Sequence, residues 1–138
     1  MATSPRVLAF DVTVDRDRVA HSALGGTPLA REDEWWPEHL VLAALVRCSL
    51  GSLDYATRRA GIEAEGCGTA HGVVTKRDED GLYAFVEIET TLDVHLEATL
   101  DESELRLLLE RAERGCFVSN SLTTRPRHHW IVNGQEVR

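Results

Sequence analysis

A long, mostly apolar segment in the first half of the chain constrains the fold most. It begins at Pro37, ends before Gly61, and reads PEHLVLAALVRCSLGSLDYATRRA. A proline suits the first turn of a helix, Glu38 complements its positive end, and glycine after two arginines is a typical end signal. We therefore predict one long helix that is apolar on more than one face and central to the core. Its apolar positions are Leu40, Val41, Ala43, Ala44, Leu45, Cys48, Leu50, Leu53 and Ala56.

Alternating segments on both sides of this helix predict strands. Before it, RVLAFDVTVDRDRVAHSAL indicates two short strands with a turn near residues 15–17. After it, AEGCGTAHGVVTKR and LYAFVEIETTLDVHLEATL indicate two long strands joined by the turn DEDG. One face of the second long strand is expected to be buried and the other to be wetter. The buried face is expected to carry Leu82, Ala84, Val86, Ile88, Leu92, Val94 and Leu96.

A second helix is expected to begin at Asp101, where Asp101 and Glu104 fit a capping box. Gly115 is expected to end or kink it, and residues 116–122 are expected to form a further helical turn. The segment RHHWIVNGQEV predicts a final strand or hairpin with an Asn133-Gly134 turn. The order of elements predicts a single α+β domain, residues 1–138, with two main helices packed on an antiparallel-rich sheet.

Composition narrows the possible environments and partners. The 138 residues suit one domain, and the net charge of −8 disfavours nucleic acid as a partner. The longest uninterrupted apolar run, Leu40 to Val46, is far shorter than the roughly 20 residues of a membrane span. The first residues lack a signal-peptide pattern. We therefore expect a cytoplasmic protein with no membrane partner, in a compartment that keeps thiols reduced.

The chain has three cysteines, at positions 48, 67 and 116. An odd number argues against a disulfide framework, and no CxxC or zinc-finger spacing occurs. The six histidines are scattered apart from His128 and His129, so no metal is expected. Taken alone, each cysteine has a structural explanation as a small buried side chain.

Two motifs change this interpretation for Cys48 and Cys116. The first helix opens with Pro-Glu, continues through an alanine-rich apolar turn and carries Cys48 ten residues after Glu38. The later segment AERGCFVSNSL places Cys116 near a helix end, with a following valine and serine. Both motifs resemble those of the OsmC/Ohr family, named for osmotically inducible protein C and organic hydroperoxide resistance protein. The resemblance implies an OsmC-like fold in an intertwined homodimer with sites at the interface.

The resemblance also implies an activity, the thiol-dependent reduction of hydroperoxides, often organic ones. Cys48 would attack the peroxide, and Cys116 would resolve the resulting sulfenic acid as a disulfide. No metal or organic cofactor is implied. Electrons would come from an external dithiol, which in parts of the family is a lipoyl-bearing protein.

In this family an arginine held by the glutamate at the helix start activates the attacking thiol. Glu38 matches that glutamate, and Arg31 is the best match for the arginine, although its gap to Glu38 is short. Arg16 and Arg18 are the alternatives, because some members place the arginine in the N-terminal strands. From the residues alone, Glu38 is a helix-dipole residue and Arg31 is a solvated charge.

A second function stays open: an OsmC-like domain that binds a ligand or a partner without peroxidase activity. Two departures favour it, the short loop before Glu38 and Phe117 in place of the common proline. Cys67 matches neither motif and is expected in the core or at the surface. Trp35 and Trp36 could line an apolar mouth or a subunit interface. Arg47 adjoins Cys48 but would point elsewhere on a helix.

Overall fold

The computed structural model describes residues 4–30 and 34–137 of the chain. It divides into two compact units, Met1–Pro37 and Glu38–Arg138, and each is described by itself. The large unit consists of a layer of helices packed on one sheet, and the small unit is a β-hairpin.

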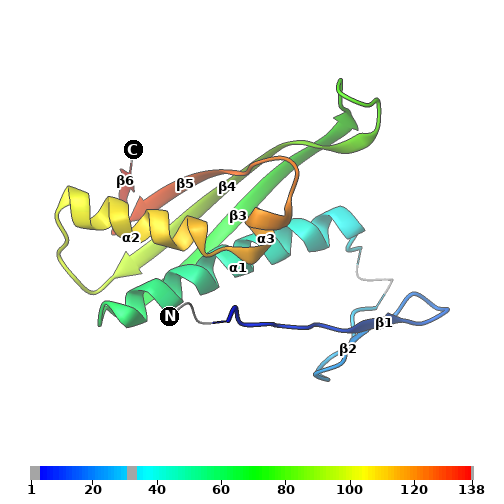
Figure 1. Ribbon diagram of the computed structural model, residues 1–138, viewed down its shortest axis with the longest axis horizontal. Coiled ribbons are helices and arrows are strands. Elements are labelled where there is room, and N and C mark those ends of the chain that lie inside the picture. The colour runs from blue at the N-terminus through cyan, green and yellow to red at the C-terminus, as the bar shows by residue number, and fades with distance from the viewer. Residues whose placement is uncertain (1–3, 31–33, 138) are drawn as a thin grey trace. The chain divides into compact units, whose positions relative to one another are not determined.

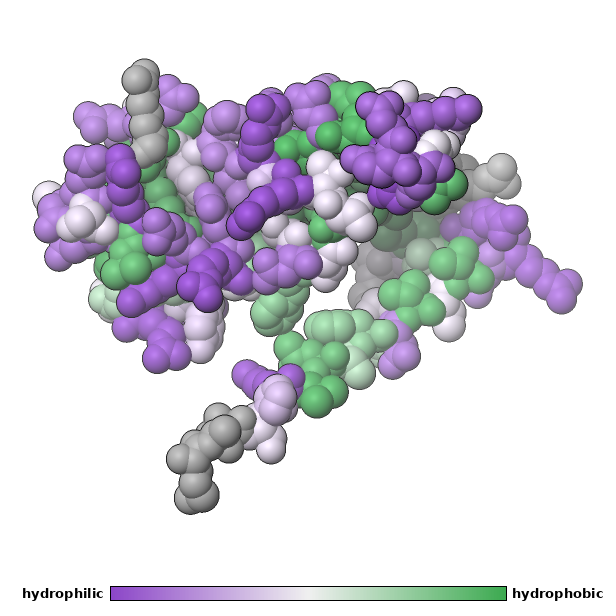
Figure 2. All heavy atoms as spheres, turned by 45° about the horizontal axis from the view of Figure 1, so that its top comes forward, coloured by the Kyte–Doolittle hydropathy of each residue, from purple (hydrophilic) through white to green (hydrophobic). Residues whose placement is uncertain are grey.

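The small unit contains two short strands, as the sequence predicted. β1 (Val12–Val14) pairs antiparallel with β2 (Ala20–Ser22), and the turn between them places Arg18 at a φ of 69°. None of its described residues is buried. The apolar side chains of the extended segment before β1 are exposed and appear green in Figure 2.

The large unit contains three helices and a four-stranded sheet. In chain order it runs α1 (Pro37–Arg59), β3 (Ala64–Lys76), β4 (Tyr83–Leu96), α2 (Glu102–Arg114), α3 (Phe117–Ser121), β5 (Arg127–Val132) and β6 (Gln135–Val137). The strand order is β3-β4-β5-β6, with β4 and β5 parallel and the other pairs antiparallel (Figure 1). The crossover between the parallel strands carries α2 and α3. These elements confirm the predicted α+β class and its antiparallel-rich sheet.

The predicted start and end signals of α2 are confirmed. Asp101 caps α2: its side chain accepts from the backbone N–H of Glu104, and the Glu104 side chain accepts from the backbone N–H of Asp101. Gly115 follows the last turn of α2, as the sequence predicted. The Asn133-Gly134 turn has positive φ at both residues and joins β5 to β6.

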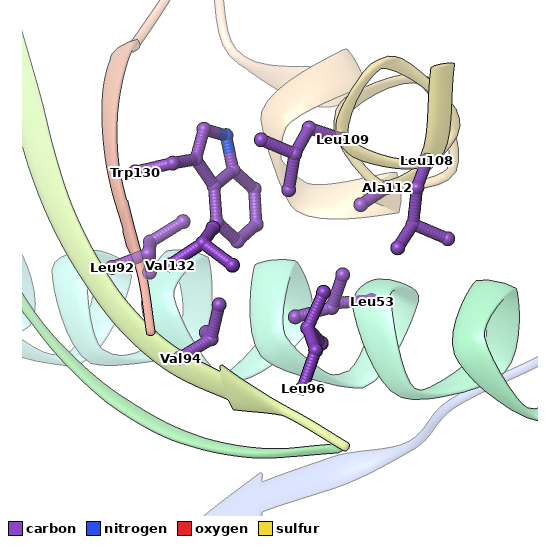
Figure 3. Close-up of a cluster of buried hydrophobic side chains, with 9 residues drawn as sticks. All are labelled: Leu53, Leu92, Val94, Leu96, Leu108, Leu109, Ala112, Trp130 and Val132. Carbon is purple, nitrogen blue, oxygen red and sulfur yellow. The ribbon is translucent and has the colours of Figure 1, made fainter. Parts of the chain in front are cut away.

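The main core lies between the helices and one face of the sheet. Figure 3 shows nine buried side chains from α1, β4, α2 and β5 converging, with the Trp130 indole facing Leu109. Each fully buried side chain of this size contributes about 1.5–3 kcal/mol, so this cluster is the main source of the unit's stability. The cluster consists of Leu53, Leu92, Val94, Leu96, Leu108, Leu109, Ala112, Trp130 and Val132.

Small residues on β3 let α1 approach the sheet closely. A Cβ added at Gly68 would lie 2.8 Å from Leu92 of β4 and 3.0 Å from Val46 of α1. Gly66 and Gly72, on the same face of β3, are equally confined. The alternation of glycine along β3 therefore leaves room for the side chains of the central helix.

Part of the predicted buried face of β4 is wrong, because the strand contains a β-bulge. Val73 pairs with Glu87 but Val74 pairs with Phe85, so Val86 is an extra residue in β4. Between the bulge and the hairpin tip, the residues of β4 therefore face the opposite side from the one that simple alternation predicts. Phe85 packs into the core in place of Val86, which is 38% exposed. The buried face was predicted correctly from Ile88 to Leu96 and wrongly for Leu82, Ala84 and Val86.

By length and composition, α1 could cross a membrane, contrary to the expectation drawn from uninterrupted apolar runs. A core helix of a soluble protein passes the same test. In this unit α1 packs against the sheet and α2 and buries Leu45, Ser49, Leu53 and Thr57. Two of these four residues are polar, which suits a helix that makes specific contacts within a protein core.

Candidate active site

The two cysteines of the predicted pair lie in one apolar cluster. Cys116 is fully buried with Leu45 of α1 and Ile88 of β4, and the half-buried Cys48 packs against them. Leu42, Phe85, Val118 and Leu122 complete this group, which we call the thiol cluster. Both cysteines are free thiols. Residues 68 positions apart in the chain therefore share one small apolar space.

Cys116 is the N-cap residue of α3 and has an extended backbone. Its sulfur accepts a hydrogen bond from the backbone N–H of Ser119 at 3.5 Å. The Ser49 hydroxyl lies at the same distance, 3.5 Å, from the Cys116 sulfur. Ser49 is 2% exposed and follows Cys48 on α1. Both partners are polar groups inside an otherwise apolar cluster.

Opposing effects act on the Cys116 thiol. Burial raises its pKa, and the hydrogen bonds from Ser49 and Ser119 lower it in part. The neighbouring Cys48 thiol raises the pKa of Cys116 further, through a hydrogen bond and through charge. The two sulfurs are thus close enough to influence each other's charge, and the Cys116 thiol loses its proton less readily than an exposed cysteine does.

A second serine fastens α1 to the end of α2. The Ser52 hydroxyl donates to the Ala112 carbonyl at 2.6 Å. A Cβ added at Gly115 would lie 2.6 Å from the Ser52 oxygen, so the absence of a side chain at residue 115 makes room for this serine. The position of Cys116 is therefore fixed from α1, the helix that carries Cys48.

Glu38, the described charged residue of the predicted site that lies in this unit, does not join the thiol cluster. Glu38 is exposed in the first turn of α1. It lies ten positions before Cys48 on the helix, or about 15 Å along the axis, so the two side chains of one chain do not touch. Arg31 lies outside the described residues. Arg16 and Arg18 are exposed next to the β1–β2 turn of the small unit.

The remaining predicted positions fall at the surface. Cys67 is exposed on β3 and points away from α1, since its neighbours Gly66 and Gly68 face that helix. Trp35 and Trp36 are 52% and 69% exposed. Arg47 is exposed on α1. Within residues 4–30 and 34–137, no three His, Cys, Asp or Glu side chains are grouped to hold a metal ion.

A polar pocket of about 480 Å³ lies beside the thiol cluster but does not include either sulfur. Its lining combines carboxylates and guanidinium groups from α2 and from the segment before β5, unlike the apolar thiol cluster. His128 also lines it and bonds to Thr90 at 2.7 Å. The charged lining residues are Glu110, Glu113, Arg114 and Arg125.

Comparisons with known proteins agree with the motifs. A family model described as OsmC-like protein matches residues 30–130. The structure of an OsmC-like protein from Mycoplasma pneumoniae is similar with a TM-score of 0.72 at 15% identity, covering 94% of this chain and 99% of that chain. No curated protein matches the chain.

Two structures of organic hydroperoxide resistance proteins also share the fold. OhrB of Bacillus subtilis has a TM-score of 0.59 at 20% identity and covers 91% of this chain and 98% of its own. The protein from Elizabethkingia anophelis has a TM-score of 0.62 at 20% identity, with coverages of 95% and 98%. At these identities the likeness establishes the fold.

Proposed function

The chain belongs to the OsmC-like protein family, and we propose that it is a thiol-dependent hydroperoxide reductase that uses Cys48 and Cys116. The observation that carries the proposal is the meeting of these two thiols, from separate helices, in one apolar cluster. Structural relatives named for organic hydroperoxide resistance support the substrate class.

In the first step, the Cys48 thiolate attacks one oxygen of the peroxide bond. The sulfur is oxidised to a sulfenic acid, the O–O bond breaks, and the departing alkoxide takes a proton to become an alcohol. Cys48 suits this role because it is the less buried of the two thiols. The surrounding leucines and Phe85 suit the alkyl group of an organic peroxide.

In the second step, the Cys116 thiolate attacks the sulfur of the Cys48 sulfenic acid. A disulfide forms and hydroxide leaves, which takes a proton to become water. An external dithiol then reduces the disulfide by thiol–disulfide exchange and is itself oxidised. A lipoyl-bearing protein is the candidate reductant.

The activating cation is proposed to be Arg31, with Arg16 and Arg18 as alternatives. Glu38 would hold its guanidinium through a two-pronged hydrogen bond. Because Glu38 and Cys48 of one chain are about 15 Å apart along α1, such a bridge suits a site completed by a second subunit. We propose an intertwined homodimer in which both units form one OsmC-like domain, residues 1–138. We also propose that it works in the cytoplasm; proteins of this family are soluble.

The direct test is peroxide consumption with a dithiol reductant. Cys48→Ser should abolish it. Cys116→Ser should leave a sulfenic acid on Cys48 that a dimedone probe traps. Cys67→Ser is the matched control and should keep full activity, since Cys67 faces the opposite side of the sheet from α1. Full turnover by the Cys48→Ser variant would refute the mechanism.

The second candidate is an OsmC-like ligand-binding or partner-binding protein without peroxidase activity. The polar pocket beside α3 favours it, as does Phe117 in place of proline. Mass spectrometry after one equivalent of organic peroxide separates the two functions. Rapid loss of two hydrogens with a Cys48–Cys116 crosslink supports the reductase. Slow, unselective oxidation of all three cysteines supports the binding protein.

A further inference from the structure

Ser49 has no assigned role in the proposed reaction, yet it is the polar side chain of α1 nearest to the Cys116 sulfur. It is 2% exposed, and its hydroxyl lies 3.5 Å from that sulfur. Leu45, one turn earlier on the same helix, and Ile88 of β4 are fully buried beside it in the thiol cluster. A hydroxyl inside an apolar cluster is costly unless it makes a hydrogen bond, so its partner here matters.

Besides the Cys48 thiol, the Cys116 sulfur has two hydrogen-bonding partners, which lie at equal distances of 3.5 Å. The backbone N–H of Ser119 can only donate. The Ser49 hydroxyl can donate or accept while Cys116 is a thiol, but a thiolate can only accept. Loss of the thiol proton therefore turns both contacts into hydrogen bonds to an anion, which are stronger than neutral ones.

We propose that Ser49 is a positioning residue for the resolving step: its hydroxyl, with the Ser119 N–H, holds the Cys116 sulfur as a thiolate aimed at oxidised Cys48. This inference rests on the proposed function. It adds a group that explains how a fully buried cysteine can act as a nucleophile. The balance of the step is unchanged, since Ser49 keeps its proton while hydroxide leaves the Cys48 sulfur.

Among the described residues, the Cys48 thiol of α1 is the titratable group that acts on Cys116. Glu113 and Arg114 end α2 and His128 lies on β5, but they line the polar pocket, and Glu113 accepts from the Trp130 indole N–H. The other neighbours from α1, β4 and the α3 segment are uncharged: Leu42, Leu45, Phe85, Ile88, Val118 and Leu122.

The experiment measures the resolving step alone, in single turnover. The reduced protein is mixed with one equivalent of peroxide at a series of pH values from 6 to 11, quenched with a sulfenic acid trap, and analysed by mass spectrometry. Formation of the sulfenic acid depends on peroxide concentration and should be unchanged in Ser49→Ala. The resolving step, which consumes the sulfenic acid, does not depend on peroxide concentration. This step should be slower in Ser49→Ala than in the wild type.

The expected effect has a characteristic pH dependence. Loss of one hydrogen bond should move the midpoint of the resolving step up by about one pH unit. The thiolate fraction then falls about tenfold at neutral pH, while the more basic sulfur is intrinsically about threefold more reactive, so the net rate falls about threefold. Above both midpoints the variant should be at least as fast as the wild type.

Thr57→Ala is the matched control, because Thr57 is also a buried hydroxyl residue of α1, 1% exposed, and it bonds to the Asp54 carbonyl of its own helix instead of the sulfur. It should leave the midpoint in place. An unchanged midpoint in Ser49→Ala, or an equal slowing at every pH, would overturn the role of Ser49.

Failure of the proposed function would give a different result from failure of the role of Ser49. If peroxide does not oxidise Cys48, the reductase is refuted. Ser49 is then tested by titrating the thiolate absorbance of Cys116 in a Cys48→Ala, Cys67→Ala background. Addition of Ser49→Ala should raise that titration midpoint, and an unchanged midpoint would refute its effect on Cys116.

Discussion

At the scale of single residues, a serine and two cysteines illustrate what sequence reasoning can and cannot find. Cys48 and Cys116 were singled out because each sits in a motif with a distinctive spacing. Ser49 was missed, since a serine in a helix carries no signal until its neighbour across the fold is known. The contact that gives it meaning joins residues 67 positions apart.

The first residue-scale prediction concerns the proposed cation. Arg31→Ala and Glu38→Gln should each slow alkylation of Cys48 at neutral pH by about tenfold and move its pH midpoint upward, because the cation no longer favours the thiolate. Arg31→Lys should recover only part of the rate, since lysine cannot form the two-pronged bond. The measurement is the pH dependence of Cys48 alkylation, in a background that lacks Cys67. An unchanged profile in Arg31→Ala would shift the role to Arg16 or Arg18.

A second residue-scale prediction concerns His128. Its burial lowers its pKa, with opposing influences from Glu113, which raises it, and His129, which lowers it. The unfolded chain therefore binds a proton at higher pH than the folded chain does, and stability should fall as the pH drops below about 6.5. Urea unfolding at pH 7.5 and pH 5.5 should show this loss, and His128→Gln should reduce it.

His95→Gln is the control for this measurement, because His95 is exposed on β4 and is not among the groups that shift the pKa of His128. Asp80 and Asp101 do not obscure the result, since their pKa values are lowered from values already below this pH range. An equal pH dependence in His128→Gln and wild type would show that His128 is not the group responsible.

At the scale of elements, most boundaries could be predicted because their signals are local. Proline and glutamate at the start of α1, the capping box of α2 and the Asn133-Gly134 turn all act within a few residues. The bulge at Val86 could not be predicted, because the register of a strand depends on its partner. The hydrophobic alternation of β4 reads smoothly through Val86, although the buried face changes there.

The prediction at this scale concerns the close approach of α1 to β3. Gly68→Ala should destabilise the protein by about 1–3 kcal/mol, because its Cβ would meet Leu92, Val46 and the Thr91 carbonyl at 2.8–3.0 Å. Urea unfolding gives the free energy of unfolding. Thr69→Ala, on the exposed face of the same strand, should change it by less than about 0.5 kcal/mol. Equal effects of the two substitutions would show that α1 can move away from β3 without cost.

At the scale of the whole molecule, the sequence predicted the fold class and the family. It did not predict what covers the exposed apolar side chains of the Met1–Pro37 unit. A two-stranded hairpin is marginally stable in water, and this one has no buried residue among those described. Several of its apolar side chains are more than half exposed, including Val7, Phe10, Val12 and Val14. Such a surface needs a partner, and the proposed homodimer supplies one.

The proposed homodimer should give a particle of about twice 15.4 kDa in sedimentation equilibrium at micromolar concentration. Replacing Phe10, Val12 and Val14 together by Ser, Thr and Thr should shift it toward monomer, because the apolar contact that favours association is removed. Leu24→Ser is the control: Leu24 is 92% exposed in a turn and should leave the dimer intact. If the site is completed across the interface, peroxide consumption should fall in parallel with the dimer fraction. A fully active monomer would instead place the activating arginine and the two cysteines in the same chain.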